Sequence, residues 1–248
     1  VDGADGLIHA AGLTLARADD DYQRVNVAGA AAAAKTAADA KARFVHLSSM
    51  SAREPHLSPY AASKRASEAE VLEVAPGAAI LRLPAIYGPR DLVTLPFFKL
   101  VKTGWAPRPA TAEPGRFSLL YVDDAAGAVL AALRAPALCG VFEVGDSEED
   151  GVSWGELGET LGAAFGRAPR SVAAPRWILS LYNRAALGYA RAFNAAPTAR
   201  SGQVNEFFHP DWVARNNLLS DSADWTPAVR LEEGFAKTVR WYQDNGYL

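Results

Sequence analysis

The residues best suited to chemistry lie in a stretch of seventeen, SSMSAREPHLSPYAASK, at positions 48–64. Tyr60 and Lys64 are four residues apart, and Ser58 followed by Pro59 is a typical helix start. On one helix, side chains at this spacing lie about 5–6 Å apart at Cβ. An ammonium group so close to a phenol lowers its pKa from about 10, so that the phenol can pass a proton near neutral pH. We therefore predict that Tyr60 is a general acid and base.

A Tyr-x-x-x-Lys spacing alone is common on amphipathic helices and would not single out this pair. Its neighbours strengthen the prediction, because an apolar run at 44–47 ends in Ser48 and Ser49, eleven residues before Tyr60. The serine pair at the end of the strand and Tyr60 at the start of the helix would both lie at the carboxyl edge of a parallel sheet. This edge is where α/β folds bind ligands. The combination favours a catalytic site.

Composition excludes several classes of function. Charged residues make up 21% of the 248 positions and the formal net charge is −3, which gives no positive field for nucleic acid. The single cysteine, Cys139, excludes an intrachain disulfide, and we expect it to be a small buried apolar residue. The four histidines show no ligand spacing, so we predict no metal site. Without a long apolar run or a basic leader, we predict a cytoplasmic protein with no stable membrane insertion.

The first half of the chain alternates between strands and helices. The pattern predicts strands at 6–9, 43–49, 78–83, 117–122 and 141–144, and helices at 19–40, 58–75, 91–103 and 123–133. Asp123 or Asp124 would cap the last of these helices. A close approach to a neighbour at Gly29, or a bend near Asn26, is expected in the first helix. Residues 104–115 read as a surface loop. Such alternation requires right-handed βαβ crossovers, so the predicted fold class is α/β with a Rossmann-like doubly wound parallel sheet.

The last hundred residues read as a smaller, mainly helical lobe. The predicted helices are 153–166, 175–193, 210–217 and 231–245, with weak strands near 171–173 and 203–208. We predict a boundary between 1–145 and 146–248, with 91–116 contributing to the second part. The helix at 175–193 has three arginines at helical spacing opposite an apolar face. That face could contact a lipid headgroup or a sugar-nucleotide phosphate, but we interpret it as a lobe helix with a solvated face.

Six segments in order resemble the extended short-chain dehydrogenases/reductases, the NAD-dependent epimerase/dehydratase family. They are LIHAAG, RVNVAGA, FVHLSSMSA, YAASK, LRLPAIYGPRD and LLYVDDAAGAV. The family's glycine-rich fingerprint, which binds the pyrophosphate, does not occur here, so we expect the sequence given to begin at the family's fourth strand. The residue that selects NAD over NADP would also precede it, so the resemblance implies NAD or NADP without choosing between them.

The resemblance implies that 1–145 is part of an NAD(P)-binding Rossmann domain and that 146–248, with a contribution from 91–116, is a substrate-binding lobe. It also implies roles for individual residues. The catalytic residues would be Ser49, Tyr60, Lys64 and Asn26, with Ser48 structural and Asn26 holding the helix kink and a proton-relay water. The cofactor would contact Ala10, Ala11, Gly12, Tyr60, Lys64, Pro84, Ala85 and Ile86. The substrate would contact Met50, Ser51, Tyr87, Arg90 and Arg116, although Arg116 is offset by one from the position at which sugar-nucleotide enzymes of the family place an arginine.

The implied function is hydride transfer at a hydroxyl or carbonyl carbon of a sugar nucleotide or similar small molecule. Two alternatives remain: a steroid- or lipid-directed enzyme resembling 3β-hydroxysteroid dehydrogenases, and a catalytically silent cofactor-binding or assembly module. The family's silent members commonly lose the tyrosine or lysine, and this chain keeps both. The resemblance also implies a homodimer through the helices at 19–40 and 58–75.

Overall fold

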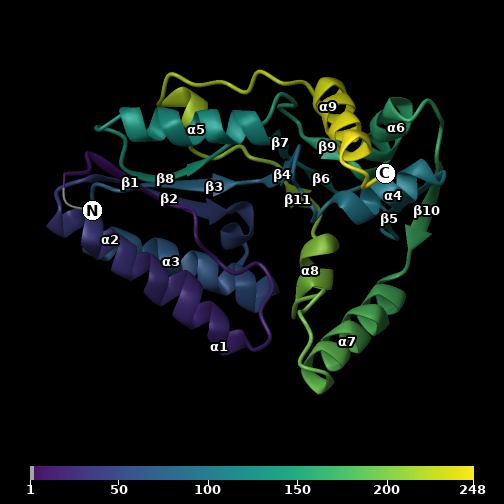
Figure 1. Ribbon diagram of the computed structural model, residues 1–248, viewed down its shortest axis with the longest axis horizontal. Helices are drawn as coiled ribbons and strands as arrows, with labels where there is room; N and C mark the ends of the chain where they lie inside the picture. The colour runs from purple at the N-terminus through teal and green to yellow at the C-terminus, as the bar shows by residue number, and fades with distance from the viewer. Residues whose placement is uncertain (1–2) are drawn as a thin grey trace.

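A parallel four-stranded sheet forms one half of the protein (Figure 1), whose computed structural model describes residues 3–248. The strands β1 (Gly6–His9), β2 (Arg43–Ser49), β3 (Ala79–Leu83) and β8 (Gly140–Glu143) lie in the order β1-β2-β3-β8. Helices α2 (Gly29–Asp39) and α3 (Pro59–Val74) cover one face, and α5 (Val122–Arg134) covers the other. β3 is buried along its whole length, as expected for a strand of a parallel sheet that helices cover on both faces. The α/β arrangement is the one predicted.

The helix predicted at 19–40 is divided by a π-helical turn. The short helix α1 (Asp19–Tyr22) leads into this turn (Gln23–Ala28), and α2 follows. The wider turn occurs around Asn26, where a bend was expected, and Asn26 is buried. Single π turns are frequent at functional sites because they redirect one side chain out of the regular helical pattern.

The second half packs small sheets and helices around an aromatic core. Its rings include Tyr87, Phe98, Phe235 and Tyr242, which meet mostly edge to face. The parallel pair β4 (Ala85–Tyr87) and β7 (Leu119–Tyr121) connects it with the main sheet. The other elements are α4 (Leu95–Lys102), β5 (Trp105–Pro109), β6 (Arg116–Phe117), β9 (Val152–Ser153), α6 (Trp154–Ala164), β10 (Arg170–Ala174), α7 (Arg176–Ala192), α8 (Gln203–Phe207), β11 (Asp211–Trp212) and α9 (Leu231–Asp244), with short 3-10 turns at Met50–Arg53, Pro55–Leu57 and Leu219–Asp221.

Several predicted elements differ from those observed. The loop predicted at 104–115 contains β5, which pairs only with β10, and such edge strands tolerate the prolines that suggested a loop. The predicted strand at 203–208 is α8. The predicted helix at 210–217 contains β11, because its backbone pairs with β6. The predicted strand at 117–122 is also shorter, since α5 begins at Val122.

Three side chains also have other environments than predicted. Cys139 is exposed rather than buried. Neither Asp123 nor Asp124 caps α5, whose first turn has no side-chain cap. Asp124 instead accepts a hydrogen bond from the Val229 amide at 2.9 Å and so fixes the segment that leads into α9.

Within residues 3–248, no helix combines the length and the apolar character needed to cross a membrane.

Candidate active site

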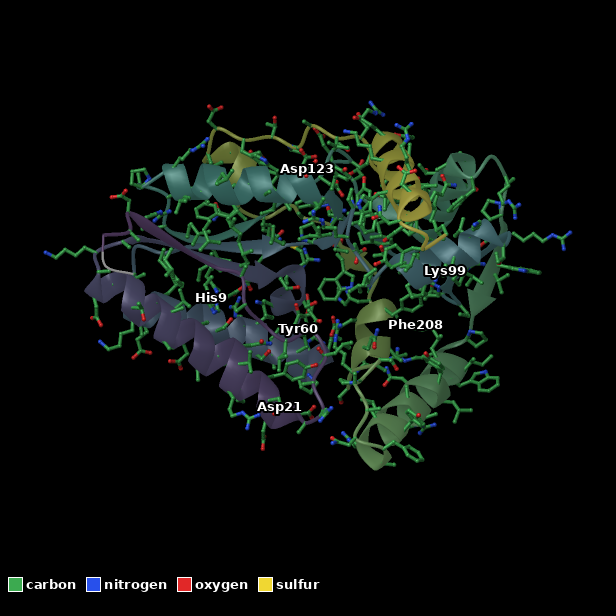
Figure 2. All side chains as sticks on the ribbon, viewed as in Figure 1. His9, Asp21, Tyr60, Lys99, Asp123 and Phe208 are labelled. Carbon is green, nitrogen blue, oxygen red and sulfur yellow. The ribbon has the colours of Figure 1, made fainter. Side chains whose placement is uncertain are left out.

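Ser49, Tyr60 and Lys64 meet at the carboxyl edge of the main sheet. Ser49 ends β2, and α3 begins at Pro59 behind the N-cap Ser58, whose Oγ accepts the Ala61 amide at 2.9 Å. Tyr60 therefore lies in the first turn of α3, with Lys64 one turn later. Figure 2 shows Tyr60 at the end of α3 that faces α8.

Two cavities meet at Ser49 and Tyr60. The first, of about 300 Å³, also contains Lys64 and is called here the Lys64 cavity. The second, of about 330 Å³, also contains Arg200 and is called the Arg200 cavity. Both are lined by Ser49 and Tyr60. Hydroxyl groups placed where two cavities meet can assist a transfer from a molecule bound in one cavity to a molecule bound in the other.

The Lys64 cavity contains most of the residues predicted to contact the cofactor. Lys64 is buried, and its Nζ donates to the Leu47 carbonyl at 2.6 Å. The loop after β1 forms the opposite wall, where a Cβ on Gly12 would lie 3.3 Å from Asn26 Oδ1 and 4.0 Å from Lys64 Nζ. Of the residues predicted to contact the cofactor, those that line this cavity are Ala10, Gly12, Tyr60, Lys64, Pro84 and Ile86. Ala11 is exposed outside its lining, and Ala85 lines the Arg200 cavity instead.

Asn26 holds this loop in place. Its side chain accepts the Leu13 amide at 2.7 Å and donates to the Leu13 carbonyl at 3.0 Å and to Ser63 Oγ at 2.9 Å. The side-chain amide of Asn26 thus hydrogen-bonds only to the loop and to α3 among the described residues. Asn26 does not line the Lys64 cavity. The geometry assigns it a positioning contact, and the predicted water relay stays a prediction. Ser48, predicted to be structural, is buried and donates to Glu68 at 2.6 Å.

The pKa of Tyr60 differs from the prediction. Burial raises it above the ordinary value, while a hydrogen bond from Ser49 and the charge of Arg200 lower it. The guanidinium of Arg200 lies over the Tyr60 ring, 4.6 Å from its centroid. The cation that acts on the phenol therefore belongs to the second half of the chain, whereas the sequence analysis expected Lys64 to do so.

Arg200 and Glu206 form a largely buried ion pair beside Tyr60, and neither residue was predicted from the sequence. Their Nη2 and Oε2 atoms are 2.7 Å apart. Glu206 also accepts hydrogen bonds from the hydroxyl groups of Ser51, at 2.9 Å, and of Ser58. Ser58 thus caps α3 and holds Glu206 at the same time. Through Ser58, the pair joins α8 to the first turn of α3, which contains Tyr60.

A close backbone approach brings α8 to this position. Gly202 precedes α8 with a left-handed φ of 75°, and a Cβ there would lie 2.4 Å from the Leu57 carbonyl oxygen. Asn205 Nδ2 donates to the same carbonyl at 3.0 Å. Only glycine satisfies both the backbone conformation and the available space. Gly202 therefore sets the distance between α8 and Tyr60.

The predicted substrate residues divide into two groups. Met50 and Ser51 line the Arg200 cavity. The other three do not line this cavity, and their contact with a substrate stays a prediction. Tyr87 belongs to the aromatic core, and Arg90 is exposed with a left-handed φ of 71°. Arg116 is held outside by the carbonyl oxygens of residues 150 and 151, at 2.8 and 2.7 Å, and by Glu156 at 3.2 Å.

A third cavity, called here the apolar cavity, adjoins the Arg200 cavity. It measures about 340 Å³, and its walls are almost entirely aliphatic and aromatic. Ala85, Phe117, Trp154 and Phe207 line both cavities, so these side chains form the boundary between them. Tyr87 lines the apolar cavity. The cavity that contains the Ser49 and Tyr60 hydroxyl groups therefore adjoins a space suited to hydrocarbon.

Burial lowers the pKa of Lys64 from 10.5 to about 8, against an opposing effect of Glu68. Because the folded-state value is the lower one, the unfolded chain binds more protons between these two pH values, and stability rises with pH there. Between about pH 7.5 and about pH 9.5, we expect the free energy of unfolding of the wild type to increase by about 2 kcal/mol relative to Lys64→Met. Urea unfolding of both proteins at each pH measures this difference. A constant difference would contradict the lowered pKa.

These features are those of a short-chain dehydrogenase/reductase site. Residues 1–145 match the NAD-dependent epimerase/dehydratase family, and the chain belongs to this family. It is thus an NAD(P)-dependent oxidoreductase or epimerase, as the resemblance implied. It is 37% identical over 246 residues to the ceramide reductase of Caulobacter vibrioides, an alignment that covers 99% of this chain and 76% of the relative.

Solved structures confirm the fold class. The UDP-glucuronic acid 4-epimerase of Bacillus cereus in complex with NAD has a TM-score of 0.71 at 17% identity, covering 97% of this chain and 75% of that one. The Bordetella bronchiseptica enzyme WbmG in complex with NAD and UDP has a TM-score of 0.69 at 18% identity, covering 98% and 74%. At these identities the likeness concerns the fold alone.

Proposed function

We propose that the protein is an NAD(P)-dependent reductase that converts a carbonyl group of a ceramide-type, long-chain lipid into a hydroxyl group. This is the lipid-directed alternative of the sequence analysis rather than the sugar-nucleotide one. The observation that carries it is the apolar cavity beside Ser49 and Tyr60. The ceramide reductase relative, which aligns with nearly the whole chain, supports the same substrate class.

The charges at the site also favour a lipid over a sugar nucleotide. A nucleotide diphosphate needs cations that are free to pair with it. Among the described residues that line the Arg200 cavity, Arg200 has the only permanent positive charge, and Glu206 already pairs with it. Arg116, the other expected phosphate ligand, is turned toward Glu156. A neutral head with a hydrocarbon chain fits these surroundings better.

In the proposed reaction, the substrate carbonyl lies in the Arg200 cavity with its oxygen toward Ser49 and Tyr60. The reduced nicotinamide, when bound, supplies the hydride to the carbonyl carbon. The Ser49 hydroxyl donates a hydrogen bond to the oxygen, and Tyr60 transfers its proton to that oxygen as negative charge develops there. Lys64 would hold the ribose of the cofactor, and Asn26 keeps the Gly12–Leu13 wall in place for it.

The role of the apolar cavity can be tested at Ala85, which lies on its boundary with the Arg200 cavity. In Ala85→Phe, the added ring would obstruct the passage between the two cavities. We expect KM for a long-chain keto-lipid to rise about tenfold, because one well-packed apolar contact is lost. KM for a short ketone should stay unchanged, because a short ketone does not reach the apolar cavity. Consumption of NADH or NADPH gives both values.

Two comparisons make this test specific. Ala126→Phe, at an exposed position on α5, should leave both KM values unchanged. A wild-type protein that turns over UDP-sugars and not keto-lipids would refute the proposed substrate class. Equal effects of Ala85→Phe on long and short substrates would refute the assignment of the apolar cavity to the chain.

A further inference from the structure

Helix α7 has an unusual surface. Of its seventeen residues, only Ala190 is buried. Trp177 is 67% exposed, Leu181 56% and Tyr182 64%, and Phe193 just after the helix is 70% exposed. A lobe helix with a solvated polar face, as the sequence analysis interpreted it, would bury these side chains against the protein. Here the apolar face is the one exposed to solvent.

The exposed apolar residues form one continuous surface. At 3.6 residues per turn, they occupy an arc of about 160° around the helix. We call this surface the α7 face, and its members are Trp177, Ile178, Leu181, Tyr182, Tyr189 and Phe193. Arg184 and Arg191 follow at the edge of the arc next to Trp177. Aromatic and aliphatic side chains bordered by arginines are typical of helices that lie in a membrane interface.

The charged side chains of the segment that contains α7 are all positive. Residues 160–205 contain six arginines and neither an acidic residue nor a lysine, although the whole chain has a net charge of −3. Arg200 is neutralised by Glu206 inside the site, whereas Arg170, Arg184 and Arg191 are exposed. A positive segment on a negatively charged protein is complementary to an anionic lipid surface, which attracts each arginine near it.

The surface under α7 leads toward the active site. A small cavity of about 180 Å³ lies between α7 and α8 and is lined by Leu179, Tyr182, Val204 and Phe207. Phe207 also lines the apolar cavity and the Arg200 cavity. Phe207 thus borders the small cavity under α7 and both substrate cavities. A lipid could pass from one to the other when this ring rotates.

We propose that α7 docks the protein on an anionic membrane, with the α7 face among the acyl chains and its arginines at the phosphates. If the proposed function holds, a lipid substrate enters from this membrane past Phe207. Docking itself requires neither substrate nor cofactor.

Flotation with lipid vesicles tests the docking. We expect the wild type to float with vesicles of phosphatidylcholine and phosphatidylglycerol in equal parts, and much less with phosphatidylcholine alone. Trp177→Ser/Leu181→Ser should weaken binding at least about tenfold, since two apolar anchors are lost. Arg184→Gln/Arg191→Gln should weaken it about tenfold on the anionic vesicles and reduce its salt dependence.

A matched pair on another helix serves as control. Leu130→Ser/Arg134→Gln removes an exposed leucine and an exposed arginine from α5 and should bind vesicles as the wild type does. Circular dichroism checks that each variant is folded. Equal flotation of the Trp177→Ser/Leu181→Ser variant and the wild type would overturn the proposal. So would self-association through α7 without vesicle binding. Because the assay contains no substrate, neither result depends on the proposed reaction.

Discussion

Replacing Tyr60 with phenylalanine is expected to lower kcat about 10³-fold while leaving the protein folded, because it removes the proposed proton donor and little else. The ring keeps its contacts with Tyr22 and with the Arg200 guanidinium. The hydroxyl that is lost belongs to a residue that lines both cavities, and its hydrogen-bond partner Ser49 lines them too. Steady-state kinetics and thermal unfolding of the same preparation separate the loss of chemistry from a loss of stability.

Tyr22 provides the matched control. It is buried beside Tyr60, and its hydroxyl donates to the Thr14 carbonyl at 3.2 Å. Tyr22→Phe should lower the free energy of unfolding by about 1 kcal/mol and leave kcat within about twofold of the wild-type value. If Tyr60→Phe retained wild-type turnover, Tyr60 would not be the proton donor. If Tyr22→Phe lost activity to the same extent, the effect would not be specific to Tyr60.

The second large effect is expected for Glu206→Ala. The change removes the partner of Arg200 and leaves the hydroxyl groups of Ser51 and Ser58 without their acceptor. Breaking a buried ion pair from one side costs about 3–5 kcal/mol, because an uncompensated charge stays in the interior. Urea unfolding measures this loss. Activity should fall as well, since Arg200 would no longer be held over Tyr60.

An exposed ion pair gives the comparison. Glu233 and Lys237 are four residues apart on α9, with Oε1 and Nζ 2.7 Å apart, and about half of each side chain is exposed. Glu233→Ala should cost less than about 1 kcal/mol. A similar small cost for Glu206→Ala would show that the Arg200–Glu206 pair does not hold α8 against α3.

The sequence predicted the elements that local signals define. Ser58 and Pro59 marked the start of α3 correctly, and Ser153 does begin α6 with a capping box to Glu156. Gly-rich and proline-rich segments were less reliable. Pro107 and Pro109 suggested a loop, but a strand that pairs along one edge only can accommodate them.

The second half of the site could not be read from the sequence. Ser58 and Glu206 are 148 positions apart, and no periodic pattern connects them. The segment around Glu206 was predicted as a strand, and only the packing of Gly202 against Leu57 brings it to Tyr60 as α8. The proposed catalytic residues Ser49, Tyr60 and Lys64 lie within a local motif, whereas the residues proposed to select the substrate depend on tertiary contacts. The homodimer and the cytoplasmic location stay predictions.

The most direct test of the proposed reaction is the transfer of deuterium from the cofactor to a lipid. The purified protein would be given a keto-ceramide together with NADH or NADPH deuterated at the reactive carbon of the nicotinamide, and the product would be analysed by mass spectrometry. We predict a hydroxylated product that carries one deuterium on the former carbonyl carbon and that does not form with Tyr60→Phe. An unlabelled product, or no reduction of the lipid alongside turnover of a UDP-sugar, would contradict the proposed function.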